Sequence, residues 1–262
     1  LFTMRFVGTP FTFAYEQVGT NCGLIGKNAA VEVDGAAYWM SDNGFFKFTG
    51  KLESMDCLVE DYVYDDLNTT SNQFIYCGIN NLFGEVMWFY PTADSNVVNR
   101  CVIYSYLDST ASRPIWYTNA NSLYPRTTWV DSSVFGLPHA TYYDAGTDTS
   151  FDVTGNTDGI SIYYEHETGV NQVKGGVTAA IPASILSGDF DITQDQKEGI
   201  TFRGDGEHIM RVSRFLPDFI TQAGNTIVEL DLRNFPNQTA ASSSLGPFTI
   251  TSATNYQSCR AR

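Results

Sequence analysis

Apolar and polar residues alternate along this chain in short runs whose period is that of β-strands. Aromatic and β-branched residues gather in runs of about five to eight, and clusters of Gly, Asn, Asp, Ser and Pro separate these runs. Such runs fit a pleated, half-buried surface, and such clusters fit turns. The pattern therefore predicts an all-β protein.

The clearest example lies between Gly84 and Asp108. Two β-prone runs, Glu85–Tyr90 and Arg100–Leu107, flank a polar turn. Both faces of the second run are largely apolar, which indicates a strand covered on each side rather than one that faces water. The turn is expected to form a rim loop that is available for contacts with other subunits, and the residues proposed for these contacts are Pro91, Asp94 and Asn96.

Further strand-like runs fall into four groups. The first group is Ala29–Val33, Ala36–Met40 and Phe45–Thr49, and the second is Phe74–Ile79, Glu85–Tyr90, Arg100–Leu107 and Ile115–Thr118. The third is Thr127–Asp131, Ala140–Asp144, Thr149–Val153 and Ile160–His166, and the fourth is Thr178–Ile181, Ile200–Phe202, His208–Phe215 and Thr226–Asp231. A last strand, Phe248–Thr251, is expected after a small-residue linker, Thr239–Gly246. The one helical pattern, with apolar residues at i, i+4 spacing, covers Met55–Leu67.

The groups of three or four strand-like runs recur at regular intervals along the sequence. The tryptophans Trp39, Trp88 and Trp129 follow one another at intervals of about 40–50 residues. Groups of about four strands at this interval are typical of propeller blades. The sequence therefore predicts a β-propeller-like array of four-stranded blades in one domain spanning residues 1–262, and a β-sandwich pair is the alternative.

Charge limits the classes of partner. The net charge is −14, the isoelectric point is near 4.4, and no Lys/Arg cluster occurs. A protein that grips phosphates needs a basic patch, so tight nucleic-acid binding is not expected. An acidic surface past which DNA slides remains compatible, because like charge repels the DNA. No apolar run approaches the roughly 20 residues that span a bilayer, so no membrane anchor is expected.

The cysteines and histidines show no metal or redox spacing. None of the five cysteines forms a CxxC pair, which argues against a zinc site and favours buried free thiols. The usual motifs of hydrolases, NTPases, dinucleotide enzymes and zincins are absent from the sequence. We therefore expect no enzyme activity, no cofactor and no metal.

Three smaller features carry candidate chemistry. In Glu165-His166-Glu167 the two carboxylates would share one strand face and could serve a glycosidase, but solvated charges at a strand end are the favoured explanation. Arg126 and Asp131 are expected to form an ion pair within a blade or to cap it. The four tryptophans could stack on sugars, but blade aromatics more often form the core. A Gly/Thr-rich acidic loop is a candidate lumen-facing or interface loop, and its carboxylates are Asp144, Asp148, Asp152 and Asp158.

Seven segments in order resemble the C-terminal half of the tail hub or nozzle proteins of short-tailed bacteriophages, also called tail tubular protein B or DNA-stabilisation proteins. They are Val33–Glu53, Asp61–Asn68, Asn81–Pro91, Asn99–Asp108, Pro125–Asp131, Ile160–Gly169 and Arg214–Phe219, and the likeness covers roughly Val31 to Arg262. Family chains are much longer, which implies that this chain is a fragment of a larger subunit.

The resemblance implies a propeller-containing structural protein of the virion tail, made in the host cytoplasm. Six copies would form a ring around the DNA exit channel, below the portal and adaptor. The ring would retain packaged double-stranded DNA, let it pass without specific binding, and attach tail fibres or spikes. The alternative functions are a carbohydrate-binding or glycoside-cleaving propeller and, less favoured by the sequence, an extracellular adhesion module.

Overall fold

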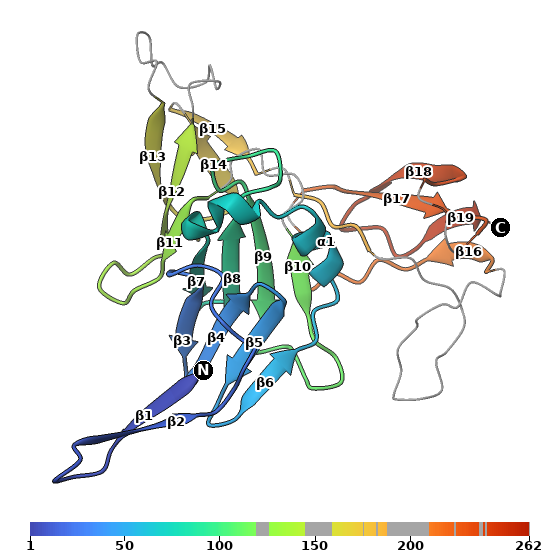
Figure 1. The fold of residues 1–262 in the computed structure, drawn as a ribbon. Helices are drawn as coiled ribbons and strands as arrows, with labels where there is room; N and C mark the ends of the chain where they lie inside the picture. The colour runs from blue at the N-terminus through green and yellow to red at the C-terminus, as the bar shows by residue number, and fades with distance from the viewer. Residues whose placement is uncertain are drawn as a thin grey trace. The chain divides into compact units, whose positions relative to one another are not determined.

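The protein is all-β, as the sequence predicts, and it divides into two compact units (Figure 1). The computed structural model describes residues 1–118, 126–144, 159–174, 176–181, 183–187, 210–222, 224–235, 238 and 240–261. The units are Leu1–Pro182 and Ala183–Arg262. Every strand pairing among the described residues that belongs to a sheet is antiparallel.

The first unit holds three successive sheets, each built from neighbouring strands in chain order. The first sheet contains β3 (Ala30–Val33), β4 (Ala36–Ser41), β5 (Gly44–Phe48) and β6 (Leu52–Met55). The second contains β7 (Tyr76–Asn80), β8 (Glu85–Tyr90), β9 (Arg100–Ser105) and β10 (Trp116–Thr118), and the third contains β11 (Thr128–Val130), β12 (His139–Asp144) and β13 (Ile160–Glu165). Along the chain, the helix α1 (Glu60–Asp65) and the 3₁₀ segment η1 (Thr69–Phe74) follow β6 and precede β7.

The remaining strands form pairs. In the first unit β1 (Phe2–Phe6) pairs with β2 (Phe13–Gln17), and β14 (Asn171–Lys174) pairs with β15 (Val177–Ala180). In the second unit β16 (Val212–Phe215) pairs with β19 (Gln257–Ala261), and β17 (Thr226–Leu232) pairs with β18 (Ser243–Ile250).

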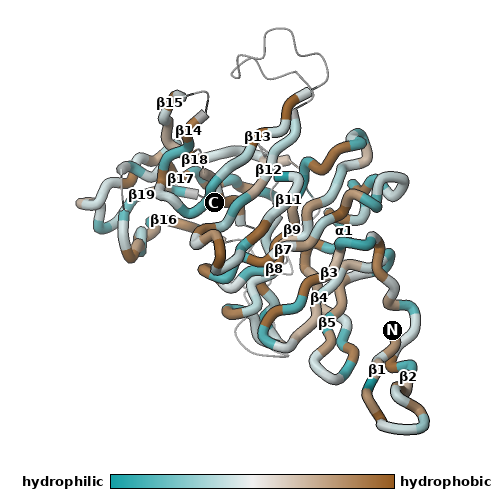
Figure 2. Tube along the Cα trace, turned by 90° about the vertical axis from the view of Figure 1, so that its left-hand side faces the viewer, coloured by the Kyte–Doolittle hydropathy of each residue, from teal (hydrophilic) through white to brown (hydrophobic). Residues whose placement is uncertain are grey.

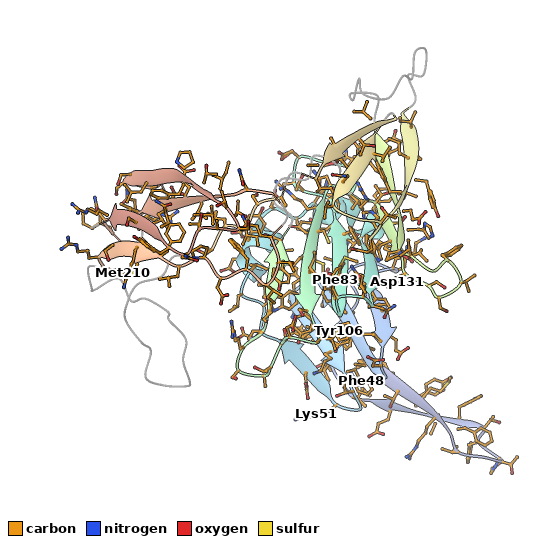
Figure 3. The ribbon with its side chains drawn as sticks, turned by 180° about the vertical axis from the view of Figure 1, so that it is seen from behind. Phe48, Lys51, Phe83, Tyr106, Asp131 and Met210 are labelled. Atoms are coloured by element: carbon orange, nitrogen blue, oxygen red, sulfur yellow. The ribbon has the colours of Figure 1, made fainter. Side chains whose placement is uncertain are left out.

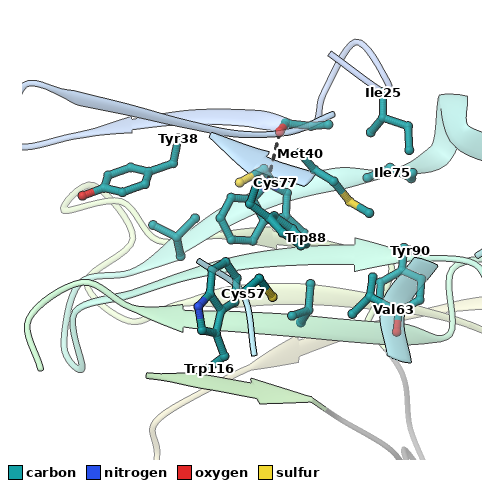
Figure 4. Close-up of a cluster of buried hydrophobic side chains, with 14 of the residues drawn as sticks. Ile25, Tyr38, Met40, Cys57, Val63, Ile75, Cys77, Trp88, Tyr90 and Trp116 are labelled. Carbon is teal, nitrogen blue, oxygen red and sulfur yellow. Dashed lines mark hydrogen bonds between the residues drawn. The ribbon is translucent and has the colours of Figure 1, made fainter. Parts of the chain in front are cut away.

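The first two sheets stack face to face around an aromatic core (Figure 4). The ring of Phe45 lies 4.9 Å, centroid to centroid, from the rings of both Trp88 and Trp116. The indole N–H of Trp88 donates to the Ala29 carbonyl at 3.1 Å, and the Cys77 amide donates to the Asn28 carbonyl at 2.8 Å. These contacts bring the first strands of the two sheets, β3 and β7, side by side (Figure 1).

The second and third sheets stack in the same way. Trp129 of β11 packs on Phe89 at 6.5 Å between ring centroids and donates its indole N–H to the Ile79 carbonyl at 2.7 Å. Gly78 lies directly beneath it, and a Cβ at this position would be 3.0 Å from the Cβ of Trp129. The second sheet is therefore covered on both faces, which confirms the prediction from its two apolar faces.

Three sheets thus stack in chain order with their first strands, β3, β7 and β11, in adjacent positions. Stacked antiparallel sheets of this kind are consistent with the predicted propeller-like array and with the sandwich-like alternative. The prediction of one such domain over residues 1–262 stays a prediction for the chain as a whole, because the array described here belongs to Leu1–Pro182.

Most expected strands are present, with some corrections. The linker expected at Thr239–Gly246 is wrong in its second half, because β18 already begins at Ser243 and pairs with β17. The expected helix at Met55–Leu67 is shorter, at Glu60–Asp65. The strands that were not expected are β1, β2, β6, β14 and β19. The expected strands Thr149–Val153 and Ile200–Phe202 lie outside the described residues.

Candidate functional site

The rim loop between β8 and β9 is a firmly held structure. Asn68, which precedes η1, donates its backbone N–H to the Pro91 carbonyl at 3.0 Å and its side-chain amide to the Ser95 carbonyl at 2.8 Å. Inside the loop, the Thr92 amide donates to the side chain of Asn99 at 2.9 Å. Of the three residues expected to meet a partner, Asp94 and Asn96 are exposed, whereas Pro91 is fully buried.

The loop forms one wall of a groove of about 370 Å³. This size lies in the range of small-ligand clefts. The lining comes from the segment before β3, from η1, from β7, from the rim loop and from the start of β11, and its residues are Lys27, Asn28, Gln73, Phe74, Tyr76, Asn96, Val97, Val98, Thr127 and Thr128. The groove therefore lies where the first strands of the three stacked sheets begin.

The lining suits recognition better than proton transfer. Phe74 is 53% exposed and offers an apolar contact. Lys27 is the one cation among the lining residues. Burial and the neighbouring Cys77 raise the pKa of Tyr76, so the Tyr76 hydroxyl stays protonated. The Thr127 and Thr128 hydroxyls hydrogen-bond with the Thr141 hydroxyl, at 2.8 and 2.7 Å. These groups can bind a polar partner, but they do not form an acid–base pair.

Sequence reasoning found only the rim-loop part of this groove. Lys27, Gln73 and Phe74 come from separate segments whose meeting depends on how the sheets stack. None of them belongs to a local motif. Lys27 is the first charged residue after Glu16, and this isolation is the one signal in the sequence that marks it.

The segment Glu165-His166-Glu167 does not place its carboxylates as expected. The strand β13 ends at Glu165, which is exposed, and Glu167 has a left-handed φ of 59°. The expectation that both carboxylates share one strand face is therefore wrong. The Glu167 carboxylate instead accepts from the side-chain amide of Asn80 at 3.3 Å, which links the end of β13 to β7.

Further polar side chains lie close to the contact between Asn80 and Glu167, at one end of the second sheet. Burial raises the pKa of the Glu85 carboxyl, and the negative charges of Glu167 and Asp108 raise it further. Asp108 in turn accepts from the Ser105 hydroxyl at 3.1 Å.

No group of three His, Cys, Asp or Glu side chains suited to a metal ion occurs among the residues that the structure describes.

Arg126 and Asp131 do not pair with each other. Each of them binds a residue of another strand or sheet. Asp131 accepts from the Asn81 amide at 2.7 Å and so caps the β7–β8 turn of the neighbouring sheet, near Phe83 (Figure 3). Arg126 donates from Nε to Nε2 of His166 at 2.8 Å and lies over the Tyr164 ring at 4.1 Å. The capping role is thus found for Asp131, but it acts between sheets.

His166 is a half-buried, neutral imidazole. Its ring centroid lies 4.6 Å from that of Trp129. Burial lowers its pKa to about 4, and the nearby Arg126 and His139 add to this effect. Because Nε2 accepts from Arg126, the proton of the neutral ring lies on Nδ1.

This environment predicts an acid-sensitive third sheet. Between pH 6.5 and 4 the unfolded chain takes up a proton at His166 that the folded chain does not, so stability present above pH 6.5 is lost as the pH falls through about 4. After allowance for partial exposure, we expect a loss of about 2 kcal/mol. Urea titrations from pH 7 to 4 should show a flatter dependence in His166→Gln, whose amide oxygen can still accept from Arg126. Parallel curves for the two proteins would contradict this assignment.

The remaining candidate residues give a mixed outcome. All four tryptophans are at most 9% exposed and belong to the core, so none is presented to a sugar. All five cysteines are buried and free, as expected, and burial raises the pKa of the Cys57 thiol to about 12. In the acidic loop Asp144 ends β12, while Asp148, Asp152 and Asp158 lie outside the described residues.

Comparison with known proteins leaves the interpretation to the structure itself. No protein-family model matches the chain, and no curated protein sequence matches it. Within the described ranges, no helix has the length and apolar character needed to cross a bilayer.

Proposed function

We propose that this chain is a structural subunit of a bacteriophage tail hub or nozzle ring. In this role it lines the DNA exit channel, retains the packaged genome and attaches fibres or spikes to the tail of the virion. The observation that carries the proposal is the stack of three antiparallel sheets in chain order, with a firmly held loop at the end where β3, β7 and β11 begin. Such a stack supports contacts at its ends and needs no catalytic group.

Ring assembly follows from how such a subunit would be used. Identical rigid subunits that meet through two different surfaces close into a ring when the rotation between them divides a full turn. Six copies would surround the channel, with the tail adaptor on one side and fibres or spikes on the rim. Asp94, Asn96 and the groove beside them are the proposed contact sites for these neighbours.

Charge supports passage of DNA rather than its capture. The net charge of −14 repels the phosphate backbone, which would limit adhesion while the genome leaves. Retention of the genome before ejection would then be steric. No cofactor and no catalytic step is needed for either task.

The carbohydrate-binding or glycoside-cleaving alternative has lost its support from the tryptophans, since all four are buried. It retains one test. Release of reducing sugar from a polysaccharide, abolished by Glu165→Gln or Glu167→Gln, would favour it over the structural role.

The ring itself provides the main test. Negative-stain images and sedimentation of the purified 262-residue chain are expected to show six-copy rings with an axial channel. The same preparation should not retard linear double-stranded DNA in a gel at physiological salt. Discrete monomers at all concentrations, or tight DNA binding that falls steeply with salt, would contradict the proposal.

A further inference from the structure

The N-terminal hairpin carries an apolar face that nothing in the described structure covers. In an antiparallel pair, residues opposite each other share a face, and Met4 lies opposite Tyr15 while Phe6 lies opposite Phe13. Together with Phe2 they form the apolar face of the hairpin, which Gln17 opposite Phe2 borders at its base. The apolar members are 65% (Phe2), 57% (Met4), 72% (Phe6), 49% (Phe13) and 69% (Tyr15) exposed. The other face carries Thr3, Arg5, Ala14 and Glu16.

The hairpin stands apart from the stacked sheets of its own unit (Figure 1). β1 and β2 pair only with each other among the described strands, and the tube of Figure 2 shows brown and teal segments alternating along them. The outer face of the first sheet does not need the hairpin as a cover. Trp39 on that face is already closed over by the segment around Cys22, whose carbonyl accepts from the indole at 2.9 Å.

A projecting two-stranded hairpin is marginal in water unless something packs against it. Phe6 and Phe13 pair edge to face at 6.1 Å between centroids, which orders the tip but leaves both rings in solvent. With roughly 150–250 Å² for a large side chain, the five residues expose roughly 600 Å² of surface. A specific interface buries about 800 Å² on each partner, so the face supplies most of one side of an interface.

Charge decides which partner fits this face. Residues 1–26 contain one basic and one acidic side chain, Arg5 and Glu16, so the net charge of −14 lies in residues 27–262. Two copies of the chain repel each other over most of their surfaces. The hairpin carries no net charge, so two copies can approach through it without this repulsion. A lipid surface is a poorer partner, because interfacial peptides that bind anionic headgroups carry several basic residues and this hairpin has one.

We infer that the apolar face of the β1–β2 hairpin is buried against a second copy of this chain. Its projection from the sheets lets it reach a neighbour without a clash between the two bodies. The inference concerns how copies meet and does not depend on the tail function. The same apolar residues are buried in either of two arrangements. Two hairpins can meet face to face, or one hairpin can lie on another surface of the neighbouring copy.

Charge-matched variants on the two faces test the inference. Met4→Glu with Tyr15→Glu places two charges on the apolar face, and Thr3→Glu with Ala14→Glu places the same charges on the polar face. Sedimentation velocity from about 1 to 100 µM should show the wild-type chain self-associating, with Kd raised at least about tenfold by the first pair and changed less than about threefold by the second. Phe6→Gln with Phe13→Gln, which adds no charge, should also weaken association.

Each other outcome is decisive. A wild-type chain that stays monomeric at about 100 µM, or equal effects of the two charged pairs, overturns the inference. So does wild-type flotation with neutral phosphatidylcholine vesicles that the Met4/Tyr15 variant loses, because the face would then belong to lipid. Rings that persist in the Met4/Tyr15 variant overturn it and leave the proposed function standing. Face-dependent dimers without rings support it and contradict the ring. An unchanged thermal unfolding transition confirms that the variants keep the stacked sheets.

Discussion

Replacing Trp88 with alanine is expected to lower the free energy of unfolding by about 3–5 kcal/mol. The side chain is fully buried between the first two sheets, with Phe45 at 4.9 Å and Trp116 at 6.0 Å between ring centroids. Its removal opens a large cavity that close-packed neighbours fill only partly, and it also breaks the hydrogen bond to the Ala29 carbonyl. Both losses act at the contact that holds the two sheets together.

The measurement is urea unfolding followed by circular dichroism, so that the lost tryptophan does not change the signal. Tyr117→Ala is the control, because this aromatic residue lies on β10 next to Trp116 but is 47% exposed. We expect it to cost less than about 1 kcal/mol. Similar losses for the two variants would show that the stack of aromatic rings is not the main stabilising contact between the sheets.

The sequence predicts this core well because its signals are local. Glu85–Tyr90 and Arg100–Ser105 are dense in aromatic and β-branched residues, and such residues form strands wherever a partner covers them. The turn at Asp34-Gly35, with φ of 52° and 78°, uses residues that tolerate the left-handed region. Burial of the tryptophans follows from the same density, because large apolar rings dominate cores.

The parts that the sequence does not predict depend on long-range contacts. Ser243–Gly246 has the small, polar composition of a linker, but it becomes a strand because the alternating residues of β17 provide a partner. Glu167 follows a regular strand pattern, yet its left-handed φ turns it toward Asn80 on another sheet. Neither outcome can be deduced from neighbours in the sequence.

The groove shows the same division. Asp94 and Asn96 could be named from the turn alone, because exposed polar residues between two strands mark a loop. Lys27 and Phe74 join them only when β3, β7 and β11 stack side by side. How the sheets stack cannot be deduced from the sequence. The rim loop can therefore be identified from the sequence, but most of the other residues that line the groove cannot.

Replacing Trp129 with alanine is expected to loosen the third sheet without unfolding the first. Trp129 packs on Phe89, covers Gly78 and donates to the Ile79 carbonyl, so it is the main side-chain contact between the second and third sheets. The first sheet has its own core with the second, on the opposite face. We therefore expect a loss of about 3 kcal/mol that is local to β11–β13.

Hydrogen–deuterium exchange resolves where that loss falls. In Trp129→Ala the amides of β11–β13 should exchange roughly 100-fold faster, since 1.4 kcal/mol corresponds to a factor of ten, while β4 and β5 keep their protection. Trp129→Phe keeps one aromatic ring but removes the hydrogen bond to Ile79 and part of the buried indole, so it should cost about 1–2 kcal/mol, less than Trp129→Ala. Equal acceleration in β4 and β5 would mean that the sheets unfold as one cooperative unit. The contacts between successive sheets would then be as strong as those within them, and a stack of separately stable blades would be the wrong description.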